Sequence, residues 1–132
     1  MSYDRKTHSL VLFGGEDHNG VENDTWQFDG ATWTQVTASA VSPASRAQEA
    51  LTYDPRVGGV VMWGGVGDAG DLADTWLFAQ GQWSQLNVSG PTASQGQEAM
   101  MTYDPMIKAA LLVGGGGSSG TQPATEWVLS RG

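Results

Sequence analysis

The apolar residues of this chain gather in three short runs that recur along the sequence. Residues 10–13, 60–63 and 110–113 are apolar at every position rather than at alternate positions. Such runs are typical of strands that are buried on both faces. No segment carries apolar residues at helical spacing over three turns, and glycines separate the runs. The pattern therefore predicts an all-β protein without helices.

Other landmarks repeat at the same interval of fifty residues. Each apolar run follows a Tyr-Asp pair and leads into a double glycine. An Asp-Thr-Trp segment at residues 24–26 recurs at 74–76 and, more loosely, at 125–127, and Trp33 recurs as Trp83. We expect each repeat to form four short antiparallel strands, joined by turns in which Asp, Pro and Gly supply the required backbone geometry.

These landmarks resemble the kelch repeat, a unit of about fifty residues that forms one blade of a β-propeller. Gly14-Gly15 and Gly64-Gly65 correspond to the kelch double glycine, and Tyr53 and Trp83 to its aromatic landmarks. The resemblance extends over the whole chain. It implies a single domain of three blades, at about residues 1–38, 46–88 and 96–132. The family's better-known role, protein binding through the loops between strands, implies a non-enzymatic binding or scaffold module.

The positions of the repeats predict a partial propeller. The first blade is expected to lack its innermost strand and the third its outermost strand, because the sequence covers only parts of those repeats. Three blades would leave two apolar faces exposed, and large apolar patches are seldom left bare. We therefore expect a longer propeller or self-association, and we favour a C2 homodimer that closes a six-bladed ring. The expected interface residues are Leu10, Val11, Leu111 and Val113.

Charge and composition narrow the classes of partner and chemistry. The net charge of −8 disfavours nucleic acid and anionic membrane surfaces as partners. The sequence has no cysteine, which excludes disulfides and thiolate metal sites. It also excludes the cysteine–tyrosine crosslink of the copper oxidases that resemble kelch propellers. No signal peptide or membrane-spanning apolar stretch is recognised, so a cytoplasmic location is the default expectation.

Two acidic segments follow the first two double glycines and are the candidate binding loops. Oxygen ligands from Asp17, Asn19 and Glu22 would suit a hard cation, but their spacing does not match a calcium-binding loop. Solvated loops are the simpler interpretation, and we expect no metal and no cofactor. His8 and His18 are expected at opposite ends of a blade, where they cannot share a metal. The candidate loop residues are Glu16, Asp17, His18, Asn19, Glu22, Asp68 and Asp71.

A second candidate site is a polar channel at the centre of the ring. The polar residues that precede the second and third repeats could line it. The alternative function, a carbohydrate-binding or enzymatic propeller, would use the mouth of this channel. We expect the six tryptophans to lie in the core between blades rather than on a sugar-binding surface. The candidate channel residues are Arg46, Gln48, Glu49, Gln97 and Glu98.

Overall fold

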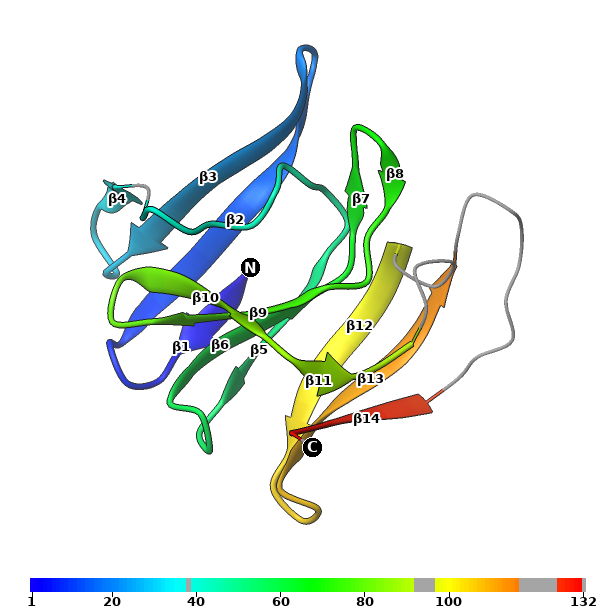
Figure 1. The fold of residues 1–132 in the computed structure, drawn as a ribbon. Coiled ribbons are helices and arrows are strands. Elements are labelled where there is room, and N and C mark those ends of the chain that lie inside the picture. Colours follow the sequence, from blue (N-terminus) through cyan, green and yellow to red (C-terminus); the bar gives the residue numbers. More distant parts are fainter. Residues whose placement is uncertain (38, 92–96, 117–125, 132) are drawn as a thin grey trace.

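The computed structural model describes residues 1–37, 39–91, 97–116 and 126–131 of the 132-residue chain. These residues form three four-stranded antiparallel sheets and one two-stranded sheet (Figure 1). The described residues contain no helix, and hence none long and apolar enough to cross a membrane. The all-β prediction is confirmed.

The three large sheets follow the three sequence repeats. The first sheet contains, in order, β1 (Ser2–Asp4), β2 (Ser9–Asp17), β3 (Gly20–Phe28) and β4 (Trp33–Val36). The second contains β5 (Ala50–Asp54), β6 (Gly59–Trp63), β9 (Thr75–Ala79) and β10 (Gln82–Leu86). The third contains β12 (Gln97–Asp104), β13 (Ala109–Gly116), β14 (Glu126–Arg131) and β11 (Val88–Ser89). The small hairpin pairs β7 (Val66–Gly67) with β8 (Gly70–Asp71).

The prediction that the first repeat lacks its innermost strand is wrong, whereas the third repeat itself supplies only three strands, as predicted. In the first sheet, β1 forms a short strand that pairs with β2 from Ser2 to Asp4. In the third sheet, the outer position is taken by β11, which pairs with β14 although it follows the second repeat in the sequence. A two-residue strand that pairs with a distant partner carries no hydrophobic pattern of its own, so sequence periodicity does not reveal it.

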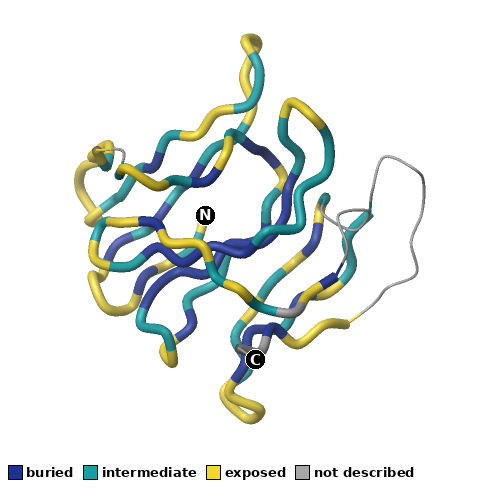
Figure 2. Tube along the Cα trace, in the orientation of Figure 1, coloured by how far each residue is buried: buried dark blue, intermediate teal, exposed yellow. Residues whose placement is uncertain are grey.

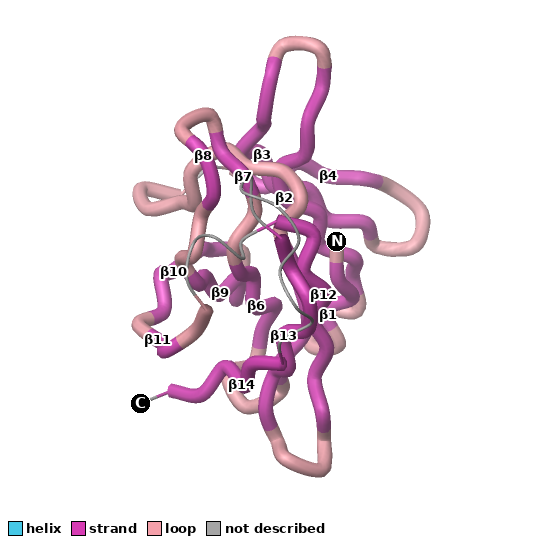
Figure 3. Tube along the Cα trace, turned by 90° about the vertical axis from the view of Figure 1, so that its right-hand side faces the viewer, coloured by secondary structure: helices cyan, strands magenta, loops and turns pink. Residues whose placement is uncertain are grey.

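The second sheet lies between the first and the third (Figures 1 and 3). Val60 and Met62 pack with Val11 and Phe13 of the first sheet. On the opposite face of the second sheet, the core joins Val61 and Trp63 to Ala110, Leu112 and Leu129 of the third. Figure 2 shows the buried residues concentrated in this central sheet. The apolar run 60–63 is therefore buried on both faces, as predicted, whereas runs 10–13 and 110–113 are fully buried only at alternate positions.

The double glycines make room for the segments that connect the sheets. Gly14 has a φ of 55°, and a Cβ there would lie 2.4 Å from the carbonyl oxygen of Arg46. The amide of Gly15 donates a hydrogen bond to that oxygen (2.9 Å). A side chain at Gly14 would therefore displace the connecting segment that crosses the first sheet, which is the close backbone approach that only glycine permits.

Three repeated aspartates fix the turns that follow the first strand of each sheet. Asp4, Asp54 and Asp104 each accept a hydrogen bond from the backbone amide two residues on, at 2.7–2.8 Å. This is the local bonding that makes aspartate a turn residue, and it confirms the turns predicted from the sequence. The first strands of the three sheets lie close together, with β5 in contact with both β1 and β12.

The tryptophans are not all in the core. Trp63, Trp76 and Trp83 are buried, as predicted. Trp33 is 42% exposed and Trp127 is 37% exposed, so the prediction is wrong for both. Trp33 lies on the face of the first sheet that points away from the second sheet. Trp127 lies on a stretch of β14 that β11 does not cover, since β11 pairs only with Ser130 and Arg131.

Candidate interaction surfaces

The outer face of the first sheet is a broad apolar surface, which we call face A. Val11 and Phe13 point toward the second sheet, so strand alternation places Leu10 and Leu12 on the opposite side. The residues directly across the strands from these two share that side. The rings of Phe28 and Trp33 on this side lie 5.1 Å apart. Face A consists of Tyr3, Leu10, Leu12, Trp26, Phe28 and Trp33.

The outer face of the third sheet is a second apolar surface, which we call face B. Ala110 and Leu112 pack against the second sheet, so Leu111 and Val113 point away from it. Val113 is 37% exposed, and its cross-strand neighbour Met100 is 72% exposed. The apolar residues of face B are Met100, Leu111, Val113 and Val128, and the polar Thr102 and Glu126 lie on the same side, across from Leu111 and Val113.

The predicted interface residues lie in different places within the chain. Leu10, Leu111 and Val113 lie on outer faces, where a partner could reach them. Val11 does not, because it is fully buried between the first and second sheets. The apolar run from residue 10 to residue 13 contains no sign of which alternate positions face inward, since all four side chains are apolar.

Faces A and B are the repeat equivalents of two surfaces that already pack together within the chain. Face A residues Leu10, Leu12 and Trp26 correspond, fifty residues on, to Val60, Met62 and Trp76 of the second sheet. Those residues pack on Val11 and Phe13 of the first sheet. Val11 and Phe13 correspond in turn, one hundred residues on, to Leu111 and Val113 of face B. The sequence patterns of face A and face B are therefore those of two surfaces that pack against each other within the chain.

An indole anchors the interface between the first two sheets. The ring of Trp83 lies 5.1 Å from that of Phe13 and 5.0 Å from that of Phe78. Its Nε1 donates a buried hydrogen bond to the hydroxyl of Thr25 in the first sheet (2.9 Å). The repeat equivalent of Thr25 is Thr75, which is 3% exposed and lines a cavity between the second and third sheets.

These two threonines offer a matched comparison. Thr25→Val is expected to lower the free energy of unfolding by about 1–3 kcal/mol, because it leaves the buried indole N–H of Trp83 without its acceptor. Thr75→Val, the same exchange at the equivalent position, is expected to change it by less than about 0.5 kcal/mol, since no described residue donates a side-chain hydrogen bond to Thr75 as Trp83 does to Thr25. Urea denaturation of both variants measures the difference. Equal losses would contradict the assignment of the Trp83 bond as the distinguishing interaction.

A buried ion pair ties the connecting segment to the second sheet. Arg46 is fully buried, and its guanidinium donates to both carboxylate oxygens of Asp74, at 2.6 and 2.9 Å. It also donates to the carbonyl oxygens of Ala44 and Gly64. Asp74 accepts a further bond from Trp76 Nε1. Burial raises the pKa of Asp74, but the bonds from Arg46 and Trp76 outweigh it and hold the pKa below its ordinary value.

The acidic segments do not converge on a metal site. The first is largely the end of a hairpin, in which Glu16 pairs with Val21 and Asp17 with Gly20. Asp17 accepts hydrogen bonds from the amide and side chain of Asn19, and its carboxylate lies 3.9 Å from His18 Nδ1. No group of three or more potential metal ligands is found among the described residues.

The remaining loop candidates are Glu22, Asp68 and Asp71. Glu22 is exposed, and its backbone carbonyl accepts from the Arg46 amide. Asp68 is exposed at the tip between β7 and β8, and Asp71 accepts a hydrogen bond from Gln97. His8 and His18 sit at opposite ends of β2, as expected. The third loop of the pattern, residues 117–125, lies outside the described residues.

The predicted channel residues differ in burial and in hydrogen bonding. Arg46 cannot line a channel, because it is fully buried in its ion pair with Asp74. Gln48 and Glu98 are exposed repeat equivalents with φ values of 61° and 55°, and the Glu98 amide donates to the Gln48 carbonyl. Gln97 is half-buried. Burial raises the pKa of Glu49, whose Oε2 has no hydrogen-bond partner among the described residues.

A hollow of about 420 Å³ lies where the first strands of the three repeats meet. Its lining is repetitive, since each of the three Tyr landmarks contributes together with the residue before it and the residue two positions after it. None of the predicted channel residues lines it. The lining residues are Ser2, Tyr3, Arg5, Thr52, Tyr53, Pro55, Thr102, Tyr103 and Pro105.

The described residues define a protein of the all-β class with an apolar outer face on each of its two terminal sheets. No protein-family model matches this sequence, and no curated protein matches it.

Proposed function

We propose that this chain is a non-enzymatic binding and scaffold module of the kelch type, in which each large sheet acts as a propeller blade. Identical copies assemble through contact of face A of one copy with face B of another. The observation that carries the proposal is the repeat equivalence of the exposed faces. Face A has the sequence pattern of the second-sheet surface that packs on the first sheet. Face B has the pattern of the first-sheet surface that receives it.

A head-to-tail contact between face A and face B generates a closed ring when the rotation between copies allows it. Two chains of three sheets each supply six blades, within the range of four to eight that propellers use. The proposed assembly is therefore a C2 homodimer with two identical junctions. Its exposed hairpins and loops, including Asp17 and Asp68, then form a rim through which protein partners bind.

The first test is the oligomeric state of the chain and of a face B variant. The wild type is expected to sediment at twice the chain mass of 13.9 kDa. Val113→Glu is expected to weaken association at least about 100-fold, because an unpaired carboxylate in an apolar interface costs about 3 kcal/mol or more. Val113 is partly exposed within one chain, and the repulsion that the new carboxylate meets from Glu126 across β14 costs only about 0.2–1 kcal/mol, so the fold should stay intact.

Ile107→Glu is the matched control. Ile107 is an exposed aliphatic residue in the turn between β12 and β13, outside both faces, and it acquires the same charge. Sedimentation equilibrium at micromolar concentration should show a dimer for this variant and a monomer for Val113→Glu. A monomeric wild type, a ring of another stoichiometry, or equal behaviour of the two variants would contradict the proposal.

A further inference from the structure

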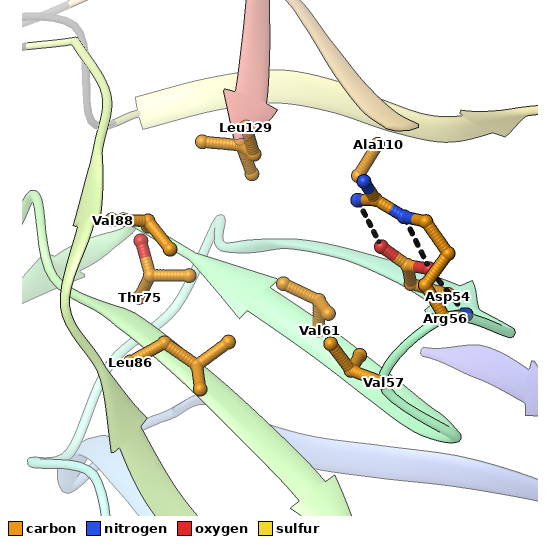
Figure 4. Close-up of a pocket in the computed structure, with 9 residues that line it drawn as sticks. All are labelled: Asp54, Arg56, Val57, Val61, Thr75, Leu86, Val88, Ala110 and Leu129. Atoms are coloured by element: carbon orange, nitrogen blue, oxygen red, sulfur yellow. Dashed lines mark hydrogen bonds and ion pairs between the residues drawn. The ribbon is translucent and has the colours of Figure 1, made fainter. Parts of the chain in front are cut away.

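The cavity between the second and third sheets occupies the place that an indole fills between the first and second. It has a volume of about 120 Å³ and is lined mainly by apolar side chains. Figure 4 shows Val57, Val61 and Leu86 on one side, with Leu129 and Ala110 opposite. Thr75 and Val88 lie on the left of the cavity in Figure 4, and the Asp54–Arg56 ion pair lies on its right.

The lining residues match, repeat by repeat, those that surround Trp83. Val61 and Thr75 correspond to Val11 and Thr25, which lie in the first interface. Ala110 and Leu129 are paired across β13 and β14 as Val60 and Phe78 are paired across β6 and β9. The cavity therefore shares with the surroundings of Trp83 a threonine hydroxyl and equivalent apolar positions, although Trp63, the equivalent of Phe13, does not line it.

The outer strand of the third sheet differs from the strand that carries Trp83 in the second sheet. Trp83 reaches the first interface from β10, the outer strand of the second sheet. In the third sheet the outer strand is β11, which is two residues long and brings Val88 to the cavity. Gly90 follows, and a Cβ there would lie 3.4 Å from Leu129 Cδ2. The part of the structure described here therefore places no aromatic side chain in the cavity lining.

We infer that this cavity is a binding site for a planar aromatic molecule with one hydrogen-bond donor, of which indole is the simplest model. Apolar cavities of about 150 Å³ remain dry and bind an aromatic ring such as benzene. At about 120 Å³ this cavity is smaller, and it is partly open, so a bicyclic ring would be only partly enclosed. Its apolar walls take the ring faces, and the Thr75 hydroxyl accepts the N–H as Thr25 accepts that of Trp83. Because the cavity lies within one chain, this site does not depend on self-association.

Calorimetric titration of the full chain with indole and with 1-methylindole, which lacks the donor, tests the inference. The wild type is expected to bind indole one to one and about 2–10-fold more tightly than 1-methylindole, the net value of one hydrogen bond. Thr75→Val should abolish this preference while still binding both compounds. A wild type that binds neither compound at millimolar concentration, or a Thr75→Val variant that keeps the preference, would overturn the inference.

Two further variants locate the site. Ala110→Leu introduces the residue found at the equivalent position 10 and fills the cavity, so it should weaken indole binding at least about tenfold. Val128→Leu enlarges an exposed residue on the opposite face of the third sheet and should leave the affinity unchanged. Val113→Glu should also bind indole like the wild type, even as a monomer, which separates this site from the proposed assembly. Equal affinity of Ala110→Leu and the wild type would place indole elsewhere and contradict the inference.

Discussion

Trp76→Ala is expected to lower the free energy of unfolding by about 3–5 kcal/mol, the range for truncating a large buried aromatic side chain. Trp76 is 7% exposed and belongs to the core between the first two sheets. The truncation removes this packing, and it also takes away the Nε1 bond to Asp74. Chemical denaturation monitored by circular dichroism gives the value. A loss below about 1 kcal/mol would show that the ring adds little to the interface.

Trp26 provides the matched control for this prediction. It occupies the equivalent position on face A, donates the same bond to Asp24, and is only half-buried. Trp26→Ala is therefore expected to cost clearly less than Trp76→Ala in a monomeric background such as Val113→Glu. If the chain self-associates through face A, the same substitution should also weaken the dimer.

Arg46→Met is expected to lower the free energy of unfolding by about 3–5 kcal/mol at pH 7. Removing one member of a buried ion pair leaves the other charge without compensation, which costs about that much. Methionine keeps the apolar stem, so the loss isolates the guanidinium bonds to Asp74, Gly64 and Ala44. The double variant Arg46→Met/Asp74→Asn should be more stable than Arg46→Met alone. A double variant that loses the sum of the two single effects would show that the pair is not coupled.

The cost of Arg46→Met is expected to depend on pH. The pKa of Asp74 is lowered in the folded protein, so the pair contributes its full stability above the unfolded-state pKa of about 3.9. That contribution is lost as the pH falls through the folded-state pKa and Asp74 takes up a proton. Denaturation at a series of pH values should show the gap between wild type and variant narrowing below about pH 4. A constant gap from pH 7 to pH 2.5 would contradict this account.

The candidate interface remains a prediction. The sequence predicts Leu10, Leu111 and Val113 at contact surfaces because a limited set of repeats leaves apolar outer faces, and within one chain these three residues point away from the second sheet. Val11 was placed wrongly, since an unbroken apolar run does not show which alternate residues face the core. The channel prediction for Arg46 failed for a related reason. Its partner Asp74 is 28 residues away, and no local pattern reports a pairing over that distance.

The sequence by itself determined what depends on neighbouring residues. The all-β class, the aspartate turns after Tyr3 and Tyr53, and the double-glycine positions follow from local backbone preferences and from the fifty-residue period. The tertiary structure decided which surfaces meet. It joined β11 to the third sheet, buried Arg46, left Trp33 exposed and opened the cavity beside Thr75. These features depend on contacts between residues distant in sequence, whose energies are set by packing and desolvation rather than by local preference.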